Sequence, residues 1–100
     1  MDITPEQVKI IRQILKKQLP VNTKVWLFGS RATKAKKEFS DLDLAIDSNQ
    51  TLSLSIMASL EHDFSESDLP YKVDIVDLNN ISESFRKKIQ TEMILFGEMN

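Results

Sequence analysis

The chain has 100 residues, 41% hydrophobic and 28% charged, a composition that suits one folded domain over residues 1–100 and excludes a disordered tail. It contains no cysteine, and His62 is its one histidine, so disulfides, thiolate nucleophiles and histidine-rich metal sites are excluded. No stretch reaches the ~18 apolar residues of a membrane span, and the N-terminus lacks a signal-peptide pattern. We therefore expect a cytoplasmic protein with no membrane partner.

The net charge of −2 conceals an uneven distribution. Residues 1–40 carry nine Lys or Arg and three Asp or Glu, a net +6, whereas residues 41–100 carry four and twelve, a net −8. Such asymmetry occurs where a polyanion site faces a cation site, and also where two faces are simply solvated. On charge alone the solvated faces are favoured.

The first predicted element is a helix that ends at Pro20. Thr4 is a good N-cap, Pro5 suits the first helical position, and Gln7 completes a capping box. Apolar residues follow at helical spacing: Val8, Ile11, Leu15 and Leu19. Residues 24–28 then form a short apolar run that predicts a buried strand, and residues 33–40 are expected to form a basic loop.

The second half of the chain alternates strands and helices. Residues 41–47 alternate strictly, which predicts a strand with leucines and isoleucine on one face and Asp41, Asp43 and Ala45 on the other. A helix over 52–64 and a strand over 72–77 follow. A helix over 81–91, capped by Asn80 and Glu83, precedes a final strand within 92–97. The order predicts an α+β fold in which three to four helices pack on a small mixed β-sheet of about four strands.

Asp41 and Asp43 are the first chemically unusual feature. Residues i and i+2 of a strand share a face, ~6.6 Å apart, so the two carboxylates repel each other. A hard cation such as Mg²⁺ relieves this repulsion, and Asp74 offers a third carboxylate if its strand is a neighbour. Alternating Asp residues also occur on the wet face of a sheet, and this pattern alone favours that interpretation.

Gly29-Ser30 favours the cation site over the wet sheet face, because the pair follows directly on the buried strand. Glycine lets a phosphate approach the backbone, serine adds a hydroxyl donor, and Arg31 can pair with phosphate oxygens. The chain has no Walker loop and no GxSxG nucleophile motif.

Gly29-Ser30, ten intervening residues, and then Asp41-Leu42-Asp43 resemble the GS-x10-DxD signature of the DNA polymerase β-like nucleotidyltransferase superfamily. The strand that includes Tyr71-Lys72-Val73-Asp74 resembles the one that carries the third carboxylate of that superfamily. The resemblance covers nearly the whole chain. The size is similar to that of the minimal nucleotidyltransferases (MNT), which are often encoded beside a HEPN-domain toxin and act as its antitoxin.

The resemblance implies a role for each of these residues. Asp41 and Asp43 ligate two Mg²⁺ ions, while Asp74 binds the catalytic metal and lowers the pKa of the attacking hydroxyl. Gly29, Ser30 and Arg31 hold the phosphates of ATP. The implied reaction transfers AMP from ATP to a hydroxyl, a tyrosine of the HEPN toxin, and releases pyrophosphate. The implied partner makes a hetero-oligomer with this chain.

Two departures keep other functions open. Many minimal members continue as GSRARG, whereas here Thr33-Lys34 replaces the second Arg and Gly. One alternative is therefore a weak or inactive antitoxin that neutralises its partner by direct binding. A separate feature, the basic stretch from Lys9 to Lys37, suggests an accessory domain for nucleic acid, which the acidic balance and the lack of interleaved aromatics argue against. In a chain this short, the acceptor is expected to be a docked protein surface.

Four other residues are expected to have no part in the chemistry of the site. Trp26 suits the core better than a base-stacking platform, and His62 is expected to be exposed. Asp47 and Asp77, at strand ends, are predicted to be caps or solvated charges.

Overall fold

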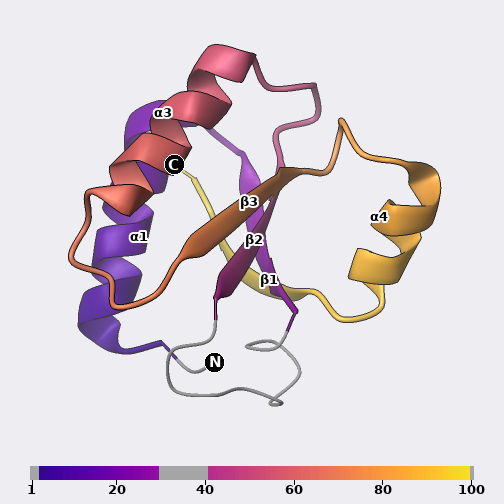
Figure 1. Ribbon diagram of the computed structural model, residues 1–100. Helices are drawn as coiled ribbons and strands as arrows, with labels where there is room; N and C mark the ends of the chain where they lie inside the picture. The colour runs from indigo at the N-terminus through magenta and orange to yellow at the C-terminus, as the bar shows by residue number, and fades with distance from the viewer. Residues whose placement is uncertain (1–2, 30–40, 100) are drawn as a thin grey trace.

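The computed structural model describes residues 3–29 and 41–99. Ser30, Arg31 and the predicted basic loop lie outside this range. The described elements follow the predicted order, and they form three helices and a four-stranded mixed sheet, which confirms the α+β class (Figure 1). In chain order they are α1 (Pro5–Gln18), β1 (Lys24–Phe28), β2 (Leu42–Asp47), α3 (Leu54–Ser65), β3 (Val73–Asp77), α4 (Glu83–Gln90) and β4 (Ile94–Glu98).

The strands lie in the order β3-β2-β1-β4. β1 is antiparallel to both β2 and β4, whereas β2 and β3 are parallel. The parallel pair needs a crossover, and α3 supplies it. The register places Phe28 beside Asp43 and Asp43 beside Asp74, so one row of side chains runs across three strands.

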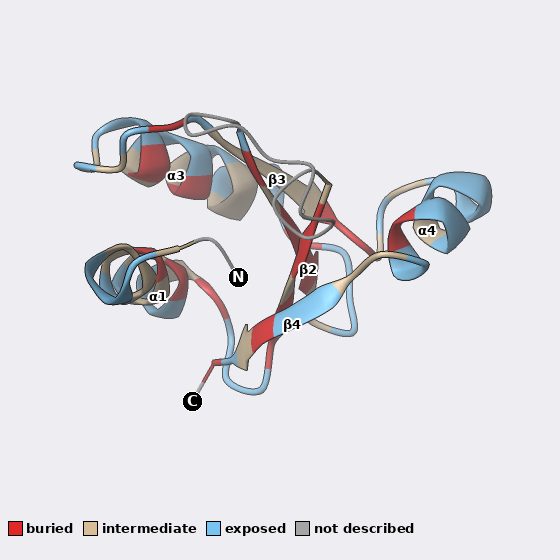
Figure 2. Cartoon of the chain, turned by 90° about the horizontal axis from the view of Figure 1, so that it is seen from below, coloured by how far each residue is buried: buried red, intermediate tan, exposed pale blue. Residues whose placement is uncertain are grey.

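The larger hydrophobic cluster fills one face of the sheet, beneath α1 and α3 (Figure 2). It contains the predicted stripe of α1, the predicted stripe of α3, and the apolar side of β2, so these three predictions are confirmed. Its buried members are Ile11, Leu15, Leu19, Val25, Leu27, Leu42, Leu44, Ile46, Leu52, Leu60, Phe64, Tyr71, Phe96 and Met99.

A smaller cluster lies on the opposite face, which carries α4 (Figure 2). It consists of Phe28, Ala45, Leu78 and Ile89. Trp26 packs against it and is half-buried, in agreement with its assignment to the core. Ile89 is the buried residue that α4 contributes to this cluster, so α4 covers its face of the sheet with fewer buried residues than α1 and α3 bring to the other face.

Hydroxyl side chains cap the helices. At α1, Thr4 accepts from the Gln7 amide and the predicted capping box is present. The predicted start of the second helix at residue 52 is two residues early, because Ser53 is the N-cap of α3 and accepts from Ile56 N.

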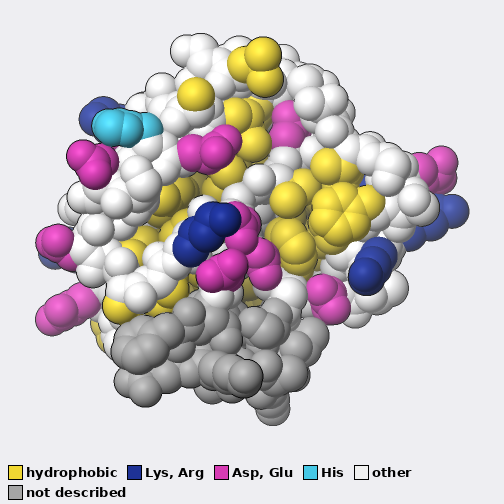
Figure 3. Space-filling model, viewed as in Figure 1, with side chains coloured by type: hydrophobic (Ala, Val, Ile, Leu, Met, Phe, Trp, Pro, Cys, Tyr) yellow, Lys and Arg dark blue, Asp and Glu magenta, His cyan; other side chains and the backbone are white. Residues whose placement is uncertain are grey.

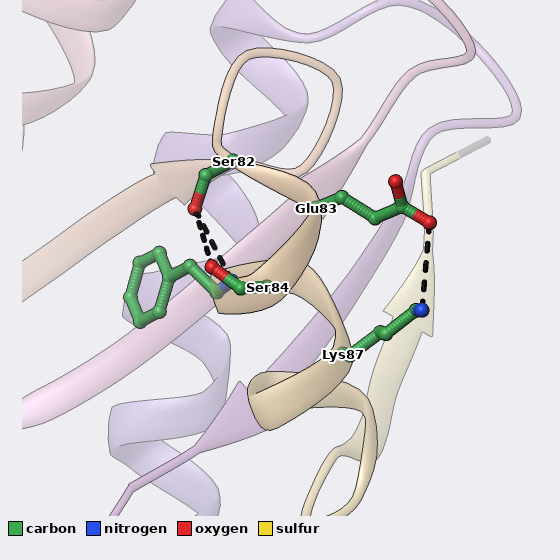
Figure 4. A network of polar contacts seen from close by, with 5 residues as sticks. Ser82, Glu83, Ser84 and Lys87 are labelled. Atoms are coloured by element: carbon green, nitrogen blue, oxygen red, sulfur yellow. Dashed lines mark hydrogen bonds and ion pairs between the residues drawn. The ribbon is translucent and has the colours of Figure 1, made fainter.

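The predicted cap of the last helix is wrong. Ser82, not Asn80, is the N-cap of α4, and its hydroxyl accepts from the Phe85 amide (Figure 4). Ser82 and Ser84 hydroxyls are 3.3 Å apart, and an exposed ion pair joins Glu83 to Lys87 at 3.6 Å. A serine two residues after Asn80 competes successfully because serine and asparagine are nearly equivalent caps.

For Asp77 the sequence leaves a cap and a solvated charge open, and the structure makes it a cap. It is 5% exposed, and its Oδ2 accepts from Leu52 N at 2.7 Å while Oδ1 accepts from Asn79 N at 2.9 Å. The carboxylate thereby joins the end of β3 to the segment before α3. His62 is exposed as expected, and no helix among the described residues has the length and apolar character to cross a membrane.

Candidate active site

Asp43 and Asp74 are neighbours on the two parallel strands. β2 and β3 pair them directly in register, and parallel neighbours point to the same face, here the face of α4. Adjacent strands are ~4.8 Å apart, so the two carboxylates face each other across one strand spacing. The structure therefore confirms that the strands of these two residues are adjacent. Asp41 precedes β2 and is exposed.

Gly29 turns the chain directly beside Asp43. Its φ of +76° lies in the left-handed region, which favours glycine. A Cβ at this position would also collide with the Asp43 carboxylate. Both observations favour glycine here, and the second places the turn against the Asp43 carboxylate. The phosphate-binding roles predicted for Ser30 and Arg31 concern residues outside the described range.

Glu92 is a residue of this site that the sequence reasoning missed. Its Oε1 accepts a hydrogen bond from Gly29 N at 3.1 Å, although the two residues are 63 positions apart. Glu92 lies in the turn between α4 and β4, and β4 runs antiparallel to β1, so the start of one strand meets the end of the other. The pairing of β1 with β4 brings Glu92 to Gly29, and the sequence alone does not predict that pairing.

Negative charge accumulates at this site. The pKa of Asp43 is raised from 3.8 to about 6, first by burial and then by the negative charges of Asp74, Asp41 and Glu92. Among the described residues, Lys72 offsets part of this charge: its Nζ lies 3.4 Å from Asp74 Oδ1, and both side chains are substantially exposed. Figure 3 shows acidic side chains gathered around a basic one in the middle of the view, beside exposed hydrophobic side chains.

The donor set suits a hard divalent cation. Within residues 3–29 and 41–99, no three acidic or histidine side chains lie close enough to form a closed metal cage. Mg²⁺ does not need such a cage, because one or two carboxylates usually hold it together with waters and substrate phosphates. The facing oxygens of Asp43 and Asp74, with the raised pKa of Asp43, fit that pattern.

Sequence comparison places the chain among known proteins. The family model described as polymerase beta, nucleotidyltransferase matches residues 9–99. A Haemophilus influenzae protein named "Probable protein adenylyltransferase MntA" is 42% identical over 98 residues, which cover 98% of this chain and 85% of that protein.

Solved structures share the fold. A toxin–antitoxin structure with AMP-PNP has a TM-score of 0.77 and 25% identity, covering 93% of this chain and 74% of that chain. A complex of a tri-AMPylated Shewanella oneidensis HEPN toxin with MNT antitoxin has a TM-score of 0.70 and 24% identity, covering 92% and 70%. The second likeness speaks for the fold alone. The chain therefore belongs to the polymerase beta family of nucleotidyltransferases, a family of enzymes.

Proposed function

We propose that this chain is the antitoxin of a toxin–antitoxin pair and that it transfers AMP from ATP to a hydroxyl, a tyrosine, of a HEPN-type toxin. The 42% identical relative is named a protein adenylyltransferase, and the structure with a TM-score of 0.77 is a toxin–antitoxin structure with AMP-PNP. The resemblance seen in the sequence supplies the HEPN partner and the tyrosine. A reaction that consumes ATP suits the cytoplasm.

Each site residue has a stated task in this proposal. Asp41, Asp43 and Asp74 hold two Mg²⁺ ions, and Asp74 also lowers the pKa of the acceptor hydroxyl. Gly29, Ser30 and Arg31 hold the phosphates of ATP. When bound, the ions stabilise the entering and leaving oxygens of an in-line displacement. The acceptor oxygen forms a bond to the α-phosphorus as the α–β bridging bond breaks, pyrophosphate leaves, and the hydroxyl proton is lost towards Asp74.

One observation carries the proposal: Asp43 and Asp74 face each other beside the Gly29 turn, and burial together with the charge of Asp74 raises the pKa of Asp43 to about 6. Without a cation, the burial and mutual repulsion of these carboxylates destabilise the folded chain. Such a cost is typical of a functional site and not of a solvated sheet face. The arrangement thus favours the cation-site interpretation over the wet-face one.

The test is label transfer to the purified cognate HEPN-type protein from ATP in the presence of Mg²⁺. We expect transfer by the natural chain and a loss of at least about 100-fold for Asp43→Asn and Asp74→Asn, as expected when a group that stabilises the transition state is removed. Asp68→Asn, the same change in the turn after α3, is the matched control. Should the natural chain transfer nothing while both Asn variants still neutralise the toxin, the antitoxin acts by binding alone.

A further inference from the structure

β3 is an edge strand whose outer backbone groups have no strand to pair with in the described structure. Leu42 N donates to Lys72 O, and Leu78 N donates to Ile46 O. In a parallel pair of strands, every second residue bonds to the same neighbour. These two bonds therefore show that residues 72, 74, 76 and 78 bond to β2. The N–H and C=O groups of Val73 and Ile75 therefore point away from the sheet, and no partner for them exists among residues 3–29 and 41–99.

A groove of about 680 Å³ runs along this edge, between β3 and the C-terminal half of α3. Phe64, Leu69, Val73 and Ile75 contribute apolar surface to it. Figure 3 shows hydrophobic side chains exposed on the side of the central acidic group that faces α3. Its size is that of a site for a small ligand or a few residues of a peptide.

The groove reaches the candidate active site. Asp74 lines it, and so does Lys72, which pairs with Asp74. Glu61 on α3 lines the other wall and is exposed. A strand added to β3 would alternate its side chains between the two faces of the sheet. The residue opposite Asp74 would place its side chain beside the carboxylate, and its two neighbours would enter the groove.

We propose that this edge binds the acceptor polypeptide as an added strand, which delivers the hydroxyl to be modified to Asp74; the inference rests on the proposed function. The backbone of the acceptor pairs with Val73 and Ile75. One residue next to the hydroxyl residue packs on the apolar surface of the groove. A basic residue near it faces Glu61, whose negative charge in the groove wall has no basic partner in the described structure. The substrate class is thus an extended segment with an apolar and a basic residue flanking the hydroxyl.

The first test removes one outward N–H. Val73 is the first residue of β3 and its N–H faces outward, a position where an edge strand accepts proline without losing a bond to its neighbour. We expect Val73→Pro to raise the KM for the HEPN-type protein at least tenfold, with the affinity for AMP-PNP changed less than twofold. Val73→Ala, which trims an apolar side chain of the groove but keeps the N–H, should raise this KM at least threefold less than Val73→Pro does. Equal effects of the two variants overturn the proposal.

A charge change gives a test that does not depend on the fold of the proline variant. Glu61→Lys should raise the same KM at least fivefold at low salt. Glu66→Lys makes the same change just after α3, at an exposed residue that does not line this groove, and should leave the KM within twofold. Identical behaviour of the two lysine variants contradicts an acceptor in the groove.

Hydrogen exchange separates the groove from the chemistry. The amides of Val73 and Ile75 should exchange quickly in the free chain and at least tenfold more slowly when the HEPN-type protein is bound. Protection without AMP transfer would support the groove and refute the proposed function. Transfer without protection of these two amides would refute the groove and leave the proposed function standing.

Discussion

Replacement of Asp43 by asparagine should stabilise this protein while it abolishes activity. The pKa of Asp43 is about 6 in the folded chain against an ordinary value of 3.8, so folding disfavours its charged form. The difference of about 2 units corresponds to at most about 3 kcal/mol at about 1.36 kcal/mol per unit. Because Asp43 is only half-buried and water screens its neighbours, we expect about 1 kcal/mol.

The sign follows from proton linkage. A raised pKa means that the folded state holds the proton more tightly, so the contribution of Asp43 to stability is fully present below pH 3.8 and is lost as the pH rises through about 6. Asparagine resembles the protonated form at every pH. The natural chain should therefore lose stability between about pH 4 and 7 relative to the Asp43→Asn variant.

Thermal unfolding in EDTA measures this difference. For a chain of this size, about 1 kcal/mol corresponds to a rise in Tm of about 4–8 °C at pH 7.5, which should shrink towards zero at pH 3.5. Asp68→Asn, with the same charge change in the turn after α3, should leave Tm within about 1 °C. Mg²⁺ with AMP-PNP should raise the Tm of the natural chain and not that of Asp43→Asn. If Asp43→Asn melts at or below the natural chain at pH 7.5 without cation, the electrostatic reasoning is wrong.

Three further predictions concern the frame around the site. Asp77→Ala should lower the free energy of unfolding by about 1.5–3 kcal/mol, because two backbone N–H groups lose a charged acceptor, and urea denaturation would contradict this by showing a loss below about 0.5 kcal/mol. Gly29→Ala should lower Tm and reduce AMP transfer at least tenfold, since a Cβ there strains the left-handed backbone and collides with Asp43; a variant that melts and reacts normally would refute that contact. Glu92→Gln keeps an acceptor for the Gly29 N–H and removes a charge beside Asp43, so in EDTA at pH 7.5 it should melt at or slightly above the natural chain, whereas Glu92→Ala, which loses the acceptor, should melt below Glu92→Gln; equal melting of both variants would contradict the role of this hydrogen bond.

The sequence predicts local structure well because local structure depends on neighbours along the chain. Alternation over 41–47 assigns Asp43 and Ala45 to one face, and the structure confirms this. The capping box at Thr4 is likewise a contact three residues apart. The cap at Asn80 fails for the same local reason, since Ser82 offers an equivalent hydroxyl nearer the helix.

Contacts between distant segments were harder to predict. The pairing of Asp43 with Asp74 depends on β2 and β3 being adjacent, which the motif resemblance implied and which alternation alone left open. The contact from Glu92 to Gly29 depends on β4 joining the far side of β1, and no pattern near residue 92 encodes that. The free edge of β3 is invisible in the sequence for the same reason, because strand order decides which strand is outermost.

The proposed reaction moves the nucleotidyl group of ATP and not its terminal phosphate. The most direct measurement compares ATP labelled at the α-phosphorus with ATP labelled at the γ-phosphorus, each incubated with this chain, Mg²⁺ and the HEPN-type protein. We expect the α label on the partner and the γ label in released pyrophosphate, and we expect EDTA to abolish both. Transfer of the γ label to the partner, or transfer that persists unchanged in Asp43→Asn, would contradict it.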